Sequence, residues 1–169
     1  AKLIKQTLET ESKIQSISSS FVDIKGSMFL GRGYSFPIAL EGALKLKELA
    51  YVHAEGYPAG EMKHGPLALI EEGMPVVVLA PRDKYYKKTI SNMQEVIARG
   101  AKVLLITNKS KDEVYSENVW EKIEVENTSE DLLPFLITVP LQKLAYYSAL
   151  KKGYDIDKPR NLAKSVTVE

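Results

Sequence analysis

Residues 75–80 read Pro75-Val76-Val77-Val78-Leu79-Ala80, and this run indicates the class of fold. A run without polar side chains is typical of a strand that is buried on both faces of a parallel sheet. Residues 102–106 form a second, mostly apolar run of this kind. A helix pattern lies between the two runs, with apolar side chains at Tyr86, Ile90, Met93 and Ile97. A strand, a helix and a strand in succession predict two parallel strands joined by a crossover helix.

The rest of the chain repeats this alternation. We expect further strands at residues 27–30 and 119–125, and helices at residues 2–21, 35–51 and 129–152. The expected fold is therefore a doubly wound α/β domain, a parallel sheet of roughly four to five strands with helices on both faces. Residues 52–65 show no period and contain glycines and a proline, so we expect a long loop of the kind that is often functional. Residues 153–169 also show no period and are expected to form an irregular C-terminal tail.

Composition excludes several classes of function. The chain has 169 residues, enough for one domain with a core of its own. Its formal net charge of +1 argues against nucleic acid or a membrane surface as a partner. The absence of cysteine excludes disulfides and thiolate metal sites and is compatible with the cytoplasm, where we expect the protein to act. The chain begins at Ala1 within an expected helix, so we expect a fragment of a longer protein.

One predicted helix carries a narrow charged face. Glu41, Lys45 and Glu48 are spaced i, i+4 and i+7, so they share one side of the helix, with Leu44 and Leu49 beside them. A surface helix normally has a broader polar face, so we expect these charges to lie in a partly dry cleft, where displaced pKa values would suit proton transfer. The alternative is an ordinary Glu41–Lys45 surface ion pair, worth roughly a few tenths of a kcal/mol. The helix alone does not decide between the two.

Both histidines lie in the expected loop. His64 stands between Lys63 and Gly65, so it is accessible and can titrate near neutral pH, although an ordinary surface histidine fits the same pattern. His53 follows an apolar helix end and is expected to be structural, as a helix cap. Two histidines with scattered glutamates do not make a metal site.

The remaining candidates lie at a turn and in the tail. Gly31-Arg32-Gly33 follows a predicted strand and precedes a helix, where α/β sheets bind anions. The third glycine of a dinucleotide fingerprint is missing, so a turn without a nucleotide is favoured. Arg160 and Lys164, four residues apart in the tail, can engage a sugar oxygen, a carbonyl or a phosphate. Composition alone instead favours a basic, disordered C-terminus.

Three segments together resemble one family. They are residues 39–48, 60–70 and 157–169, and the last is the most specific. All three are similar to the C-terminal sugar isomerase (SIS) lobe of the glutamine–fructose-6-phosphate aminotransferases, a resemblance that covers residues 25–169. It implies a flavodoxin-like SIS domain over residues 1–152, with residues 153–169 as a lid over the active site. It also implies a parent enzyme with a glutaminase domain and a first SIS domain, which this chain does not contain.

The resemblance implies a reaction and a base. In the family, ammonia adds to open-chain fructose 6-phosphate, and the imine is isomerised to glucosamine 6-phosphate without a cofactor or a metal. Glu48 would move a proton between C1 and C2 of the sugar. Lys45 and Glu41 would orient and tune Glu48. These roles agree with the charged helix face, because such an isomerisation needs one base that both takes and returns a proton.

The resemblance also implies roles outside this helix. His64 would assist opening of the sugar ring in the site of the neighbouring protomer, so we expect a homodimer. Lys164 would contact the carbonyl end of the sugar, and Arg160 would help to order the tail over the site. In the family a Ser/Thr-rich loop of the first lobe holds the phosphate, whereas the equivalent turn here offers only Ser35 as a hydroxyl.

Our interpretation is the isomerase domain of an enzyme for amino-sugar synthesis, inactive in the full reaction when isolated. The alternative is a non-catalytic module that binds sugar phosphates or dimerises. A stand-alone sugar-phosphate isomerase is disfavoured because the phosphate loop is missing.

Overall fold

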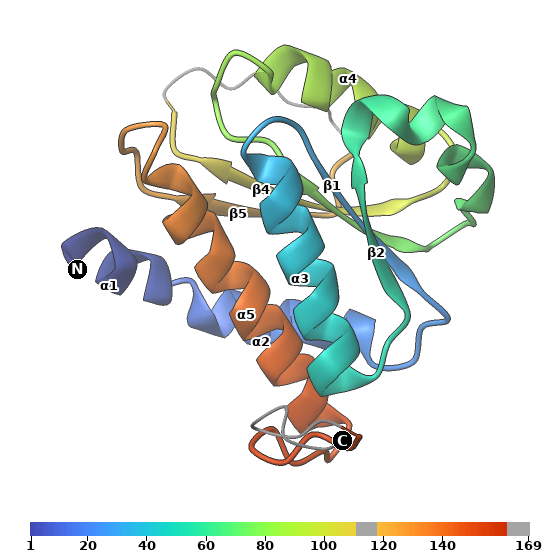
Figure 1. Ribbon diagram of the computed structural model, residues 1–169, viewed down its shortest axis with the longest axis vertical. Helices are drawn as coiled ribbons and strands as arrows, with labels where there is room; N and C mark the ends of the chain where they lie inside the picture. The colour runs from blue at the N-terminus through green and yellow to red at the C-terminus, as the bar shows by residue number, and fades with distance from the viewer. Residues whose placement is uncertain (111–117, 162–169) are drawn as a thin grey trace, which may run out of the picture.

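A computed structural model describes residues 1–110 and 118–161 and shows a three-layer α/β/α arrangement (Figure 1). The central sheet has five strands that are all parallel, in the order β2-β1-β3-β4-β5. Their bounds are β1 Ser27–Gly31, β2 Ala54–Pro58, β3 Pro75–Leu79, β4 Lys102–Asn108 and β5 Glu121–Val125. The expected doubly wound parallel sheet is confirmed.

Helices cover both faces of this sheet. One face carries α3 (Ser35–Ala50) and α5 (Leu133–Lys151), with the N-terminal α1 (Lys2–Leu8), α2 (Glu11–Ile17) and the 3-10 turn η1 (Ser18–Phe21) packed beside them (Figure 1). The other face carries α4 (Tyr86–Ile97) and the 3-10 turns η2 (Ala59–His64) and η3 (Pro66–Leu69). None of the helices in the described ranges is both long and apolar enough to cross a membrane.

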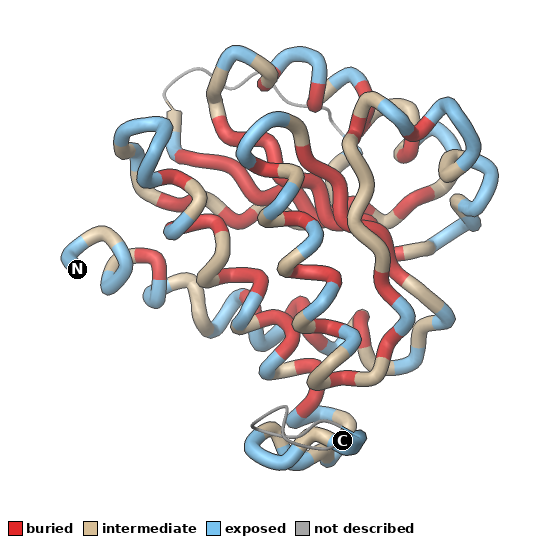
Figure 2. Tube along the Cα trace, in the orientation of Figure 1, coloured by how far each residue is buried: buried red, intermediate tan, exposed pale blue. Residues whose placement is uncertain are grey.

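The core consists of two apolar clusters, one on each face of the sheet. Successive strand residues point to opposite faces, so Phe29 of β1 joins the cluster under α3 and α5, while Met28 and Leu30 join the cluster under α4. The strands are buried along nearly their whole length in the interior of the sheet (Figure 2). This double-sided burial explains the continuous apolar run at residues 75–80.

The expectation of a loop over residues 52–65 is wrong. Residues 54–58 form β2, which pairs in parallel with β1 at the edge of the sheet, and residues 59–64 form η2. Gly56 and Pro58 make this strand hard to predict from the sequence, because both residues are disfavoured inside sheets, although they are tolerated at edges. Gly56 also has a packing reason, since a Cβ there would meet the Leu40 backbone of α3 at 2.9 Å.

The expected single helix over residues 2–21 is also wrong, because it is divided into α1, α2 and η1. Threonine hydroxyls accompany the break: Thr7 donates to the Leu3 carbonyl (3.0 Å) and Thr10 donates to the Thr7 carbonyl (2.7 Å). Such local side-chain bonds compete with the helical ladder. The other helices and strands begin and end close to the expected residues.

Candidate functional site

The charged face of α3 is present as a compact ionic cluster. The Lys45 ammonium donates to Glu48 Oε2 at 2.6 Å and lies 3.8 Å from Glu41 Oε1. The side chains of Glu41, Lys45 and Glu48 are 35%, 30% and 29% exposed, so they are neither dry nor fully solvated. The α-helical spacing therefore places one ammonium between two carboxylates on a half-buried surface.

The electrostatics of this cluster keep Lys45 charged. The hydrogen bond to Glu48 raises the pKa of Lys45 above its ordinary value, burial opposes that shift, and the nearby Glu41 charge adds to it. The ammonium is thus the dominant form of Lys45 at neutral pH, and it holds the Glu48 carboxylate in one orientation. This pair can present an oriented carboxylate to a reacting carbon–hydrogen bond.

A groove lies beside the cluster. It has a volume of about 530 Å³ and runs between α1, α3 and α5, with Lys45, Leu49, Val139 and Tyr146 among its walls. Of the three charged residues on the α3 face, Lys45 lines this groove. The structure thus places a hollow next to Lys45, and Glu41 and Glu48 are not among the residues that line it.

The start of the C-terminal tail lies at the same end of α3. The backbone N–H of Arg160 donates to the Tyr51 hydroxyl at 2.8 Å, and Tyr51 directly follows α3. Arg160, predicted as a site residue, thereby contacts Tyr51, which follows Glu48 by three positions in the chain. Lys164, the other predicted residue of the tail, lies outside the described residues.

His64 lies away from this cluster. It ends η2, and the whole of β2 separates η2 from the C-terminal end of α3, so the two sit at opposite ends of the edge strand (Figure 1). The His64 side chain is 73% exposed, and its Nδ1 lies 2.7 Å from Glu61 Oε2. This contact orients the ring. The structure does not join His64 to Glu48 within one chain.

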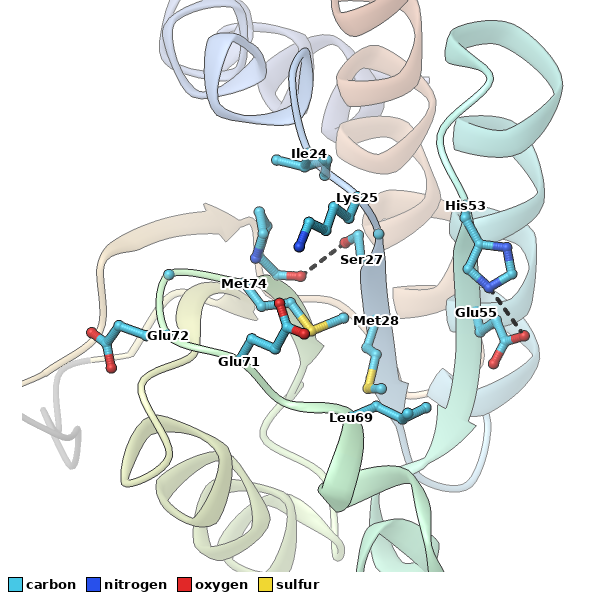
Figure 3. Close-up of a pocket in the computed structure, with 13 residues that line it drawn as sticks. Ile24, Lys25, Ser27, Met28, His53, Glu55, Leu69, Glu71, Glu72 and Met74 are labelled. Atoms are coloured by element: carbon cyan, nitrogen blue, oxygen red, sulfur yellow. Dashed lines mark hydrogen bonds and ion pairs between the residues drawn. The ribbon is translucent and has the colours of Figure 1, made fainter.

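His53 belongs to a different hollow. The left-handed residue that ends α3 is Tyr51, so the expected capping role for His53 is wrong. His53 instead lies 3.4 Å from Glu55 on the wall of a pocket of about 380 Å³ at the amino-terminal edge of the sheet. Figure 3 shows this His53–Glu55 pair facing Lys25 and Glu71 across the pocket. None of the predicted site residues within the described ranges lines it.

At the carboxyl-terminal end of β1, protein groups contact one another. Arg32 Nε and Nη2 donate to Asn92 Oδ1 at 3.2 and 2.9 Å, and Ser35 is buried. The cavity between Tyr34, Ser35 and Asp83 measures about 10 Å³, scarcely the space of one water molecule. In the described ranges, no group of three or more His, Asp or Glu side chains is arranged to hold a metal ion.

Comparison with known proteins assigns the family. The SIS domain model matches residues 20–152, which is most of the chain. This chain belongs to the SIS domain family. The SIS domain described here is 51% identical, over 168 residues and 99% of its length, to the glutamine–fructose-6-phosphate aminotransferase of Bartonella henselae. It spans 28% of the length of that relative.

Solved structures agree with this assignment. The C-terminal domain of the glucosamine-fructose-6-phosphate aminotransferase from Francisella tularensis superimposes with a TM-score of 0.88 and 46% identity. That match covers 93% of the SIS domain chain and 44% of the solved chain. A glucosamine-6-phosphate deaminase from Thermotoga maritima gives a TM-score of 0.65 and 28% identity, over 95% of this chain and 48% of that one. These SIS domain matches support the resemblance found in the three sequence segments.

Sequence reasoning missed Tyr51, which links α3 to the tail. The available signal was the absence of a glycine after the helix, because a helix that ends in the left-handed region usually has one there. Residues 51–55 contain no glycine, so another residue has to take that conformation.

Proposed function

We propose that this chain is the C-terminal sugar isomerase domain of a glutamine–fructose-6-phosphate aminotransferase, an enzyme of the cytoplasm. The parent enzyme would form glucosamine 6-phosphate from fructose 6-phosphate and ammonia released from glutamine. The observation that carries this proposal is the 51% identity over 99% of the chain to enzymes of that name, with the oriented Lys45–Glu48 pair in place. Imine formation and isomerisation are acid–base chemistry, so the proposed reaction uses no cofactor.

Glu48 is the proposed base. Once ammonia has formed a protonated imine at C2 of the open-chain sugar, the carboxylate removes a proton from C1, and the C1–H electron pair forms the C1–C2 double bond of a neutral enolamine. The same carboxyl group then returns that proton to C2, while the C1 hydroxyl loses its proton to solvent and C1 becomes the aldehyde carbon of the product. Within the described residues, Lys45 binds Oε2 of Glu48, so Oε1 of Glu48 is the oxygen that would carry out this proton transfer.

Lys45 and Glu41 are proposed to orient and tune that base. The Lys45 ammonium donates to Glu48 Oε2 at 2.6 Å and so fixes the orientation of the carboxylate. Glu41 lies on the other side of Lys45 at 3.8 Å and compensates part of its charge. The base thus works beside a cation that is itself held between two carboxylates.

Residues 153–169 are proposed to act as a lid over this site. Arg160 would hold the tail at the Glu48 end of α3, and Lys164 would contact the carbonyl end of the sugar. The docking of Arg160 on Tyr51 supports this assignment. A lid that excludes water would also protect the imine from hydrolysis.

The parent enzyme is proposed to complete the site in two ways. A first SIS domain would bind the sugar phosphate, because Ser35 is buried here and the cavity beside it measures about 10 Å³. His64 would act in the site of a second copy, in a homodimer. Its exposure and its distance from Glu48 along β2 support this arrangement.

A complementation experiment tests both the function and the dimer. Full-length Glu48→Gln and His64→Ala proteins are each expected to form almost no glucosamine 6-phosphate. After subunits are exchanged, half of the molecules are mixed dimers with one intact site of two, so activity should recover to about a quarter of the wild-type value. Mixtures that recover nothing, while wild type is active, would contradict a shared site. A wild-type protein that forms no glucosamine 6-phosphate would contradict the function.

A further inference from the structure

The C-terminal end of α3 has an unusual residue in its capping position. Tyr51 has φ 53° and ψ 36°, in the left-handed region, and its backbone N–H donates to the Lys47 carbonyl at 3.2 Å. Glycine takes this position most often because it has no Cβ to clash with the backbone. A bulky residue in this region calls for a reason beyond the local turn.

The Tyr51 side chain supplies that reason through three contacts with residues that follow α5. Its hydroxyl accepts the backbone N–H of Arg160 at 2.8 Å. The Arg160 guanidinium carbon lies 4.0 Å from the centroid of its ring, within the range of an attractive cation–aromatic contact. The ring of Tyr154 lies 4.7 Å from that of Tyr51 at an angle of 53°. One tyrosine therefore holds the segment near both its beginning and its end.

The segment between these contacts is a compact turn. Gly153 has a φ of +73°, and the Asp155 carboxylate accepts the backbone N–H groups of Asp157 (2.9 Å) and Lys158 (3.2 Å). These bonds are local and fold the chain back on itself. The bond to Tyr51 is different because it connects the end of this turn to another helix.

We propose that Tyr51 is a positioning residue for the proposed aminotransferase reaction, on which this inference rests: it ties Arg160 to the end of α3 that carries Glu48. Tyr51 follows Glu48 by less than one helical turn. Holding Arg160 therefore keeps the described end of the tail beside the end of α3 that carries the proposed base.

Two substitutions in the full-length enzyme separate positioning from folding. Tyr51→Gly suits the left-handed backbone, so the melting temperature should stay unchanged or rise, yet it removes all three contacts and should lower kcat at least about tenfold. Tyr51→Phe keeps the ring and loses one hydrogen bond, and should lower kcat by about two- to fivefold. Tyr34→Phe, an exposed tyrosine at the other end of α3, is the matched control and should change neither quantity.

A double substitution tests whether Tyr51 acts through Arg160. If it acts through the guanidinium–ring contact, Tyr51→Gly with Arg160→Ala should be slower than the slower single variant by less than about twofold, because either change removes that contact, although Arg160→Ala keeps the backbone N–H. Multiplication of the two single effects would overturn the proposal. Hydrogen–deuterium exchange of a peptide that covers Arg160 should become faster in Tyr51→Phe, and an unchanged rate would overturn the anchor itself.

The outcomes for this inference and for the function differ. An active wild-type enzyme whose Tyr51→Gly variant keeps wild-type kcat contradicts the positioning role and leaves the proposed function standing. A wild-type enzyme that forms no glucosamine 6-phosphate contradicts the function and the positioning role together.

Discussion

The two ends of α3 have opposite characters. Its N-terminal end lies at the carboxyl-terminal edge of the sheet, where doubly wound proteins ordinarily bind ligands. There Arg32 is bound to Asn92 and the cavity measures about 10 Å³. Its C-terminal half carries Lys45 and Glu48 beside a groove of about 530 Å³. Near Ser35, the customary ligand position therefore has little free space, and the proposed chemistry lies along the helix instead.

This difference explains why one lobe is insufficient for the proposed reaction. The charged half of α3 has the proposed base and a cation, and the start of the tail lies at its end. The backbone N–H groups inside a helix are already paired, whereas the turns at sheet edges offer free N–H groups to a phosphate. A second lobe with an open edge would complement a lobe with a charged helix. Substitutions at the two ends of α3 should therefore have opposite consequences for activity and stability.

The largest effect is expected at the charged half of the helix. Glu48→Gln in the full-length enzyme should lower glucosamine 6-phosphate formation by about 10²- to 10⁴-fold, because a general base contributes that much. Glutamine hydrolysis and the melting temperature should change little, since the residue is partly exposed and the glutaminase domain is separate. Parallel assays of the two products check this. Retention of wild-type amino-sugar formation would refute the assignment of the base.

The reverse pattern is expected at the N-terminal end of the helix. Arg32→Met should change kcat/KM less than about threefold, because this end does not take part in the reaction. It should lower the free energy of unfolding by about 1–3 kcal/mol, since it leaves the buried Asn92 oxygen without its donor. Denaturant unfolding and steady-state kinetics measure the two quantities, with Arg32→Lys as a control that retains a donor. A large loss of activity with unchanged stability would place chemistry at this edge.

The smallest effect concerns the ionisation of Lys45. Because the Glu48 hydrogen bond raises the pKa of Lys45, Glu48→Gln should move that pKa down toward its ordinary value. A raised lysine pKa contributes stability that is fully present below the unfolded-state pKa and is lost as pH rises through the folded-state pKa. The stability that this ion pair gives the folded wild-type protein, relative to Glu48→Gln, should therefore be lost only in strongly alkaline solution. Nuclear magnetic resonance titration of the Lys45 side chain measures the shift, and an unchanged pKa would show that the pair is not formed.

Most of the fold could be predicted from the pattern of apolar residues in the sequence. The apolar runs that became β3 and β4 could be read because burial on both faces leaves no polar positions. The strand β2 could not, because it lies at an edge and includes Gly56, which the approach of α3 requires, and Pro58. The residues of β2 are determined by its packing against α3 rather than by their intrinsic preference for strands.

The candidate site was predictable to a similar degree. Helical spacing alone places Glu41, Lys45 and Glu48 on one face, and their contacts bear this out. The link between Arg160 and Tyr51 was not predictable, because it joins residues 109 positions apart. Local sequence rules describe neither that separation nor the left-handed backbone of Tyr51 that makes the link possible.

The most direct test of the account is a calorimetric titration of full-length Glu48→Gln with fructose 6-phosphate, next to its turnover. A base that acts only in the chemical step predicts a Kd within about threefold of wild type and almost no glucosamine 6-phosphate formed. Loss of sugar binding would make Glu48 a binding group. Normal turnover would mean that the charged face of α3 does not carry out the proton transfer.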